Sequence, residues 1–354
     1  MEINAFKGEN QLRQKCEHIL TYAIMIYCIF SIPSVSGHSP LISGDTGKLD
    51  EAMFIPDPTK SWAIYGELQE GREAHYYRFE IKSDQRIYIS LMKPTSPEYK
   101  GFMPGFVVMG PGLNNRGNIP DYVEKPALAN AVVVPGVQPA EATYEPFAPS
   151  SFYQLAELNI HAPESGTYYI AVFEPLQGGH YSLAIGQSEK FSLTEWILIP
   201  VSLISIYKWE GQSMIMILLT VILIPALGLI FLWKRNWIAK TPFEWTGIMA
   251  GFLFIGTGFS VIFQMALALS RTSLVQEVAI TVILAFFPVL LGIGAIHIIM
   301  ENRERINVRK RVYLAMLGIF AFFVWAGFLV GPVLAVLASV MPAQEKKHLT
   351  ELKI

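Results

Sequence analysis

The sequence has very little cysteine. Its 354 residues include only two, Cys16 and Cys28, and both lie in or before the first apolar segment. The residues that follow therefore cannot form a disulfide among themselves, and cysteine usage does not indicate a redox compartment. The sequence also lacks an Asn-x-Ser/Thr acceptor for N-glycosylation, which favours a prokaryotic source.

An excess of positive charge is absent as well. Lysine and arginine total 27 against 29 aspartates and glutamates, which gives a formal net charge of −2. Proteins that bind nucleic acid use basic surface to neutralise phosphates, so we expect no nucleic-acid partner. The sequence further contains no phosphate loop, no Gly-x-Ser-x-Gly elbow and no His-Glu-x-x-His motif. These absences favour a protein that is not an enzyme.

Long apolar runs dominate the second half of the chain, and 52% of all residues are hydrophobic. Residues 214–233 form an almost unbroken run of about 20, the length that crosses a hydrocarbon core of roughly 30 Å as a helix. Three further runs, 245–269, 274–300 and 312–340, have the same character. The sequence therefore predicts an all-α transmembrane four-helix bundle within residues 212–342.

Charge in the loops predicts the orientation of these helices. Basic residues concentrate in the loops 234–240 and 303–311, which the positive-inside rule assigns to the cytoplasm. The N-terminal part is then extracytoplasmic, in a multi-pass protein of the cell membrane. One feature conflicts with this topology, because a fourth span would carry the lysines of the polar tail, residues 343–354, outside.

Two shorter apolar segments require separate interpretations. Residues 1–37 combine early basic residues, an apolar core and small residues near Gly37, which is typical of a signal peptide. The run 193–207 is too short for a simple span and contains Pro200. We interpret residues 191–211 as an interfacial linker helix that lies on the membrane or enters it.

Between these segments the sequence alternates apolar and polar residues with a period of two. In 75–81, Tyr77, Phe79 and Ile81 fall on one face while Tyr76 falls on the other, and 86–91, 167–174 and 180–185 repeat the pattern. Turn residues separate these runs, and no helical period competes. Residues 38–190 are therefore predicted to form an extracytoplasmic antiparallel β-sandwich.

The order of the predicted strands and the sequence of several of them resemble those of a known domain family. The segments Glu73–Phe79, Ile87–Leu91, Phe106–Gly110, Pro163–Val172 and Gly178–Ile185 resemble bacterial and archaeal pre-peptidase C-terminal domains over roughly residues 62–187. The resemblance implies a jelly-roll-like sandwich, similar to carbohydrate-binding modules, that binds a carbohydrate or protein ligand without catalysis. The chain departs from that family in a long proline-rich insertion, residues 114–149, so binding surfaces cannot be transferred.

Aromatic residues crowd the second half of the sandwich: Tyr144, Phe147, Phe152, Tyr153, Tyr168 and Tyr169. Packing in the core and between strands is the favoured interpretation of this group; the alternative is exposure on a binding surface, for which Tyr144 and Phe147 of the insertion are the better candidates.

Histidine suggests one metal site. Cleavage after Gly37 would place a free amine and an imidazole on His38, and a second imidazole from His75, His161 or His180 would complete a set of nitrogen ligands that suits copper. The alternative is that His38 is an ordinary residue near a chain terminus.

Two polar residues fall inside the apolar runs, Gln264 and His297. Polar groups in hydrocarbon are costly, and they often mark a transport path or a proton relay. The alternative roles are structural: Gln264 can hydrogen-bond between helices, and His297 can sit at the cytoplasmic interface. Gly247 and Gly251, one helical turn apart, favour close helix packing within the bundle or between copies in a homo-oligomer.

Taken together, the sequence predicts a non-enzymatic, membrane-anchored binding or accessory protein. The β-sandwich would bind a ligand or partner, and the helices would contact lipid and other membrane subunits. Two alternatives stay open: a copper-binding or redox accessory protein that uses His38, and a subunit of a membrane transport complex that uses Gln264 and His297.

Overall fold

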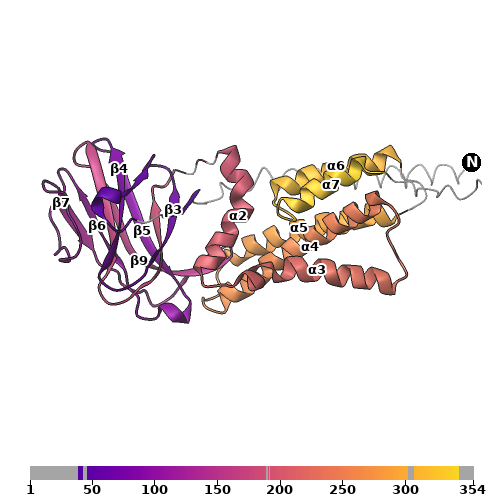
Figure 1. The fold of residues 1–354 in the computed structure, drawn as a ribbon, viewed down its shortest axis with the longest axis horizontal. Helices are drawn as coiled ribbons and strands as arrows, with labels where there is room; N and C mark the ends of the chain where they lie inside the picture. The colour runs from indigo at the N-terminus through magenta and orange to yellow at the C-terminus, as the bar shows by residue number, and fades with distance from the viewer. Residues whose placement is uncertain (1–38, 43–45, 189, 191, 302–306, 343–354) are drawn as a thin grey trace, which may run out of the picture. The chain divides into compact units, whose positions relative to one another are not determined.

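The computed structural model describes residues 39–42, 46–188, 190, 192–301 and 307–342. The predicted signal peptide, His38 and the polar tail 343–354 lie outside these ranges. The described chain consists of a β domain followed by a helical region (Figure 1).

The β domain contains two sheets. In spatial order, the six-stranded sheet consists of β1 (Ser39–Ile42), β3 (Trp62–Leu68), β11 (Gly179–Ile185), β5 (Arg86–Pro94), β9 (Ser150–His161) and β8 (Thr143–Glu145). The five-stranded sheet consists of β2 (Met53–Ile55), β4 (Glu73–Ile81), β10 (Gly166–Glu174), β6 (Gly105–Gly110) and β7 (Asn130–Val134). Apart from the parallel pairs β1–β3 and β2–β4, neighbouring strands run antiparallel. All four strands that the alternation predicts are confirmed.

Both sheets contribute to one hydrophobic core. Ile64 and Leu183 of the six-stranded sheet and Phe79 and Ile170 of the five-stranded sheet are all completely buried in it. These are the apolar positions of the period-two pattern, whose burial supplies the main favourable term for folding.

The opposite face of the five-stranded sheet is also covered, which the alternation does not predict. Tyr76 is buried there in a second apolar cluster, and its hydroxyl accepts a hydrogen bond from the backbone N–H of Glu124 at 2.7 Å. The covering residues include Ile119, Tyr122 and Val123 of the proline-rich insertion. The insertion is therefore part of the folded domain, and it also supplies strands β7 and β8.

Within the described residues, six helices follow the β domain. They are α2 (Leu193–Trp209), α3 (Met214–Lys234), α4 (Pro242–Leu269), α5 (Val278–Met300), α6 (Val308–Phe323) and α7 (Val330–Val340). Among the described residues, three of these helices, α3, α4 and α5, are long and apolar enough to cross a membrane. This result identifies a membrane protein with a β-rich domain.

Glycines set the distance between α4 and α5. A Cβ atom placed on Gly292 would lie 2.5 Å from the carbonyl oxygen of Gly251, and one on Gly258 would lie 2.6 Å from the carbonyl oxygen of Ala285. Only glycine allows the two backbones to approach this closely. The predicted role of Gly247 and Gly251 in close packing is confirmed, since a Cβ on Gly247 would meet Ile299 at 2.5 Å.

The prediction that residues 312–340 form one spanning helix is wrong. The chain leaves helical geometry after Phe323, and Trp325, Gly327 and Phe328 all have positive φ angles. At 1.5 Å per residue, α6 and α7 are about 24 Å and 17 Å long, which is shorter than a hydrocarbon core. The apolar run divides here because Gly327 adopts a left-handed backbone conformation and Pro332 lies in the first turn of α7.

The helices α6 and α7 form a hairpin that returns the chain to its starting end. A guanidinium nitrogen of Arg311, near the start of α6, donates to the backbone carbonyls of Ser339 and Met341 at 2.7 and 2.8 Å. Pro342 in turn accepts from the N–H of Phe243, beside the basic loop 234–240. The end of α7 therefore lies beside the loop that precedes α4.

Candidate functional site

The candidate site is the contact between the β domain and the helical region, which we call the joint. It is formed by Tyr144, Glu145, Ser151, Trp209, Glu210, Gln212, Gln264 and Thr281. These residues come from β8, β9, the end of α2, the turn that leads into α3, and helices α4 and α5.

The end of α2 is fixed on the six-stranded sheet by Trp209. Its indole N–H donates to the backbone carbonyl of Tyr181 at 2.9 Å, and its ring meets Tyr65 edge-on with centroids 5.4 Å apart. Nδ1 of His180 donates to the Trp209 carbonyl at 2.7 Å, which satisfies one carbonyl of the last helical turn. Three separate contacts therefore hold this helix end against strands β3 and β11.

Glu210 follows directly and carries a buried carboxyl. It is 5% exposed, and its two oxygens accept hydrogen bonds from the Ser151 backbone N–H at 3.0 Å and from the Gln212 amide at 3.1 Å. Burial raises the pKa of Glu210 to about 7, although both hydrogen bonds and the charge of Arg271 act in the opposite direction. Glu210 can therefore gain or lose a proton near neutral pH.

A small polar cavity lies beside this carboxyl. Its volume is about 70 Å³, and its lining includes Ser96, Glu210, Gln212 and Arg271. A cavity of this size with several polar partners suits ordered water, which would complete the hydrogen bonding of the carboxyl.

Gln264 has a structural position in the joint. It lies on α4, is 1% exposed, and exchanges two amide hydrogen bonds of 2.7 and 3.0 Å with Gln212. His297, by contrast, is exposed on α5. Gln264 thus makes the structural hydrogen bonds that were its alternative role, and the transport hypothesis stays a prediction.

Tyr144 and Thr281 connect β8 to α5. The Thr281 hydroxyl donates to the Pro146 carbonyl at 2.8 Å, and the Tyr144 hydroxyl therefore donates to the Thr281 oxygen at 2.7 Å. Tyr144 is 6% exposed, so the alternative of an exposed position is wrong for it, and Phe147 is half-buried. Tyr144 is buried because β8 pairs with β9 and Tyr144 contacts α5 through Thr281.

Glu145 is the second carboxyl of the joint with a raised pKa. One of its oxygens accepts a hydrogen bond from the Phe147 N–H at 3.1 Å. Burial raises the pKa of Glu145 to about 7, and this hydrogen bond lowers it only in part. Two partly neutral carboxyls thus lie where the β domain meets the helices.

The histidines predicted as copper ligands are placed apart. His75 lies between the Tyr181 hydroxyl and the Glu73 carboxylate, at 2.8 and 3.1 Å, while His180 contacts Trp209 and His161 is exposed at the end of β9. Within the described ranges, no cluster of three or more His, Cys, Asp or Glu side chains could hold a metal ion. Since His38 lies outside those ranges, the copper site stays a prediction.

Sequence reasoning missed Glu145, Glu210, Gln212 and Thr281. A usable signal was present in Glu210-Gly-Gln212, where a carboxylate and an amide interrupt two apolar helices. Such groups need partners when the helices carry them into an apolar environment.

A scan against protein-family models finds no match to this chain, and a search of curated proteins finds no significant match. Fold and site together define the chain as a membrane protein whose β-rich domain is hydrogen-bonded to its apolar helices.

Proposed function

We propose that the chain is a membrane-anchored, extracytoplasmic accessory protein without enzymatic activity. Its β domain, interpreted as a jelly-roll-like sandwich, binds a ligand or partner, and its helices anchor it and contact lipid or other membrane subunits. The observation that supports this proposal is the joint, in which hydrogen-bonded side chains connect the β domain to α4 and α5.

Simple anchoring needs neither the joint nor three apolar helices. One transmembrane helix and a flexible linker would hold a domain at the membrane while leaving its orientation free. Here buried contacts at Trp209, Glu210 and Tyr144 remove that freedom. A fixed orientation reduces the entropy lost when a second protein binds the β domain and the membrane region together. The arrangement therefore favours a partner that is itself held at the membrane.

Site-specific cross-linking in native membranes tests this function. A photo-reactive residue replaces Leu128 or Leu176, which are 98% and 83% exposed on the β domain, and the matched control replaces the exposed Ile222 of α3. We expect both β-domain positions to cross-link to one and the same membrane-associated protein, and the control to give lipid adducts. The Tyr144→Phe/Thr281→Val variant should weaken the protein adducts. Turnover of a defined substrate by the purified chain, or equal adducts in the joint variant, would overturn the proposal.

A further inference from the structure

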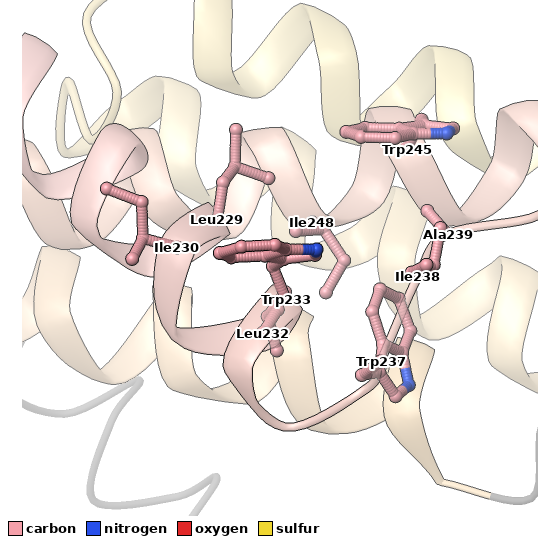
Figure 2. Close-up of a pocket in the computed structure, with 9 residues that line it drawn as sticks. All are labelled: Leu229, Ile230, Leu232, Trp233, Trp237, Ile238, Ala239, Trp245 and Ile248. Carbon is pink, nitrogen blue, oxygen red and sulfur yellow. The ribbon is translucent and has the colours of Figure 1, made fainter.

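An apolar groove lies at the other end of α3, away from the joint. Its volume is about 340 Å³, and it is bounded by the last turns of α3, the loop 235–241 and the first turns of α4. Figure 2 shows Trp233, Trp237 and Trp245 around it, with Ile248 behind Trp233. Every side chain that lines the groove is aliphatic or aromatic. The volume falls at the lower end of the range for ligand pockets, roughly 300–1,000 Å³.

Helix caps at both ends fix the shape of the groove. At the end of α3, Asn236 has a positive φ, its N–H bonds to the Trp233 carbonyl, and the Trp237 N–H bonds to the Leu232 carbonyl. This is a Schellman motif, which turns the Trp237 side chain back onto the helix that it follows. At the start of α4, Thr241 and Glu244 form a capping box. The loop is therefore short and hydrogen-bonded at both ends.

The groove is open and has cations around it. Trp233 and Trp245 are 69% and 47% exposed although both are large and apolar. Lys234, Arg235 and Lys240, at the two ends of the loop, are exposed as well. The nearby carboxylate of Glu244 is buried and accepts from backbone N–H groups of the loop. The surface around the groove consequently carries net positive charge.

We propose that this groove binds one anionic glycerophospholipid, with an acyl chain along the tryptophans and the phosphate near the three cations. The position matches this ligand because α3 is about 31 Å long, so its end falls at the level of the headgroups. Tryptophan is favoured at this depth, and cations close to the membrane surface attract anionic lipid. A zwitterionic lipid fills the apolar groove equally well but gains little from the cations. The groove should therefore select the headgroup by charge.

Lipid exchange on the full chain tests the proposal. The protein is purified in mild detergent, incubated with equal amounts of phosphatidylglycerol and phosphatidylcholine, washed, and examined by native mass spectrometry. We expect one retained lipid, with phosphatidylglycerol favoured about tenfold or more. Lys234→Gln/Arg235→Gln/Lys240→Gln should bring the ratio close to one, since each cation near an anionic surface contributes about fivefold.

Two further variants separate the groove from general electrostatics. Trp233→Ala should reduce total lipid retention several-fold, and its high exposure in the wild type means that folding is preserved. The matched control, Lys48→Gln/Lys82→Gln/Lys100→Gln, removes the same charge from exposed positions of the β domain and should leave the ratio unchanged. Equal retention of both lipids by the wild type would overturn the proposal. A preference that survives the groove triple variant, or that the control triple abolishes, would overturn it too.

Discussion

Replacement of Glu145 by glutamine should remove a specific part of the pH dependence of stability. The pKa of this carboxyl is about 7 in the folded chain against an ordinary value of 4.5. Between these values the folded state keeps a proton that the unfolded state has released, so stability falls as pH rises through this window. Glutamine resembles the protonated carboxyl, keeps an oxygen for the Phe147 N–H and cannot ionise.

The magnitude follows from the size of the pKa shift. A difference of about 2.5 units at about 1.36 kcal/mol per unit gives roughly 3 kcal/mol for complete ionisation. The variant should therefore be more stable than the wild type by about 1 kcal/mol at pH 5 and by about 3 kcal/mol at pH 8. For a domain of about 150 residues this corresponds to a difference of roughly 6–12 °C in the unfolding midpoint.

The assay is thermal unfolding of the full chain in nanodiscs, followed by the β-strand circular dichroism signal from pH 5 to 8. Glu70→Gln, at a position exposed to solvent, is the matched control and should follow the wild type at every pH. The raised pKa of Glu145 is contradicted if Glu145→Gln shows the same pH dependence as the wild type, or if the stabilisation is as large at pH 5 as at pH 8.

Three further predictions concern the joint and the helix contacts. Thr281→Val should lower the free energy of unfolding by about 1–3 kcal/mol because it leaves the buried Tyr144 hydroxyl unpaired, whereas Tyr144→Phe should lower it by about 1 kcal/mol. A double-mutant cycle from denaturant unfolding should show that the two substitutions are coupled, and simple additivity would contradict the hydrogen bond. Gln264→Leu should lower the free energy of unfolding by about 1–3 kcal/mol because it removes both hydrogen bonds between Gln264 and Gln212 and leaves the Gln212 amide oxygen without its donor. An unchanged unfolding midpoint would contradict the joint. Gly292→Ala should lower the free energy of unfolding by about 1–3 kcal/mol because it forces α4 and α5 apart. Thermal unfolding measures this loss, and an unchanged midpoint would contradict the close approach of the two helices.

Much of the secondary structure could be predicted from local pattern. The strands 75–81 and 180–185 alternate with a period of two, and the runs 214–233 and 245–269 have the length of a membrane span, so each pattern identifies its element without tertiary information. The division of 312–340 could not be predicted in this way. Its composition is that of a span, and the break depends on backbone angles at Trp325 and Phe328 and on the packing of the two short helices.

The joint could not be predicted from local sequence pattern, and the reason is physical. Its partners lie far apart in the chain, for example Tyr144 with Thr281 and Ser151 with Glu210, and each residue taken alone resembles an ordinary surface residue. Gln264 was identified as a polar residue in an apolar run, but its partner Gln212 depends on how the turn before α3 meets α4. The raised pKa values of the two carboxyls follow from burial, which composition does not reveal.

The proposed function depends most directly on the β domain being held in one orientation on the helices. Spin labels at Lys82→Cys in the β domain and Phe286→Cys on α5, with Cys16 and Cys28 replaced by serine, report this orientation by double electron–electron resonance in nanodiscs. A second labelled pair within the β domain, Lys82→Cys and Lys100→Cys, gives the width of the distance distribution that the flexible labels cause by themselves. We expect a single distance distribution between the β domain and α5 that is as narrow as this reference. A broad or multiple distribution would contradict the proposed function.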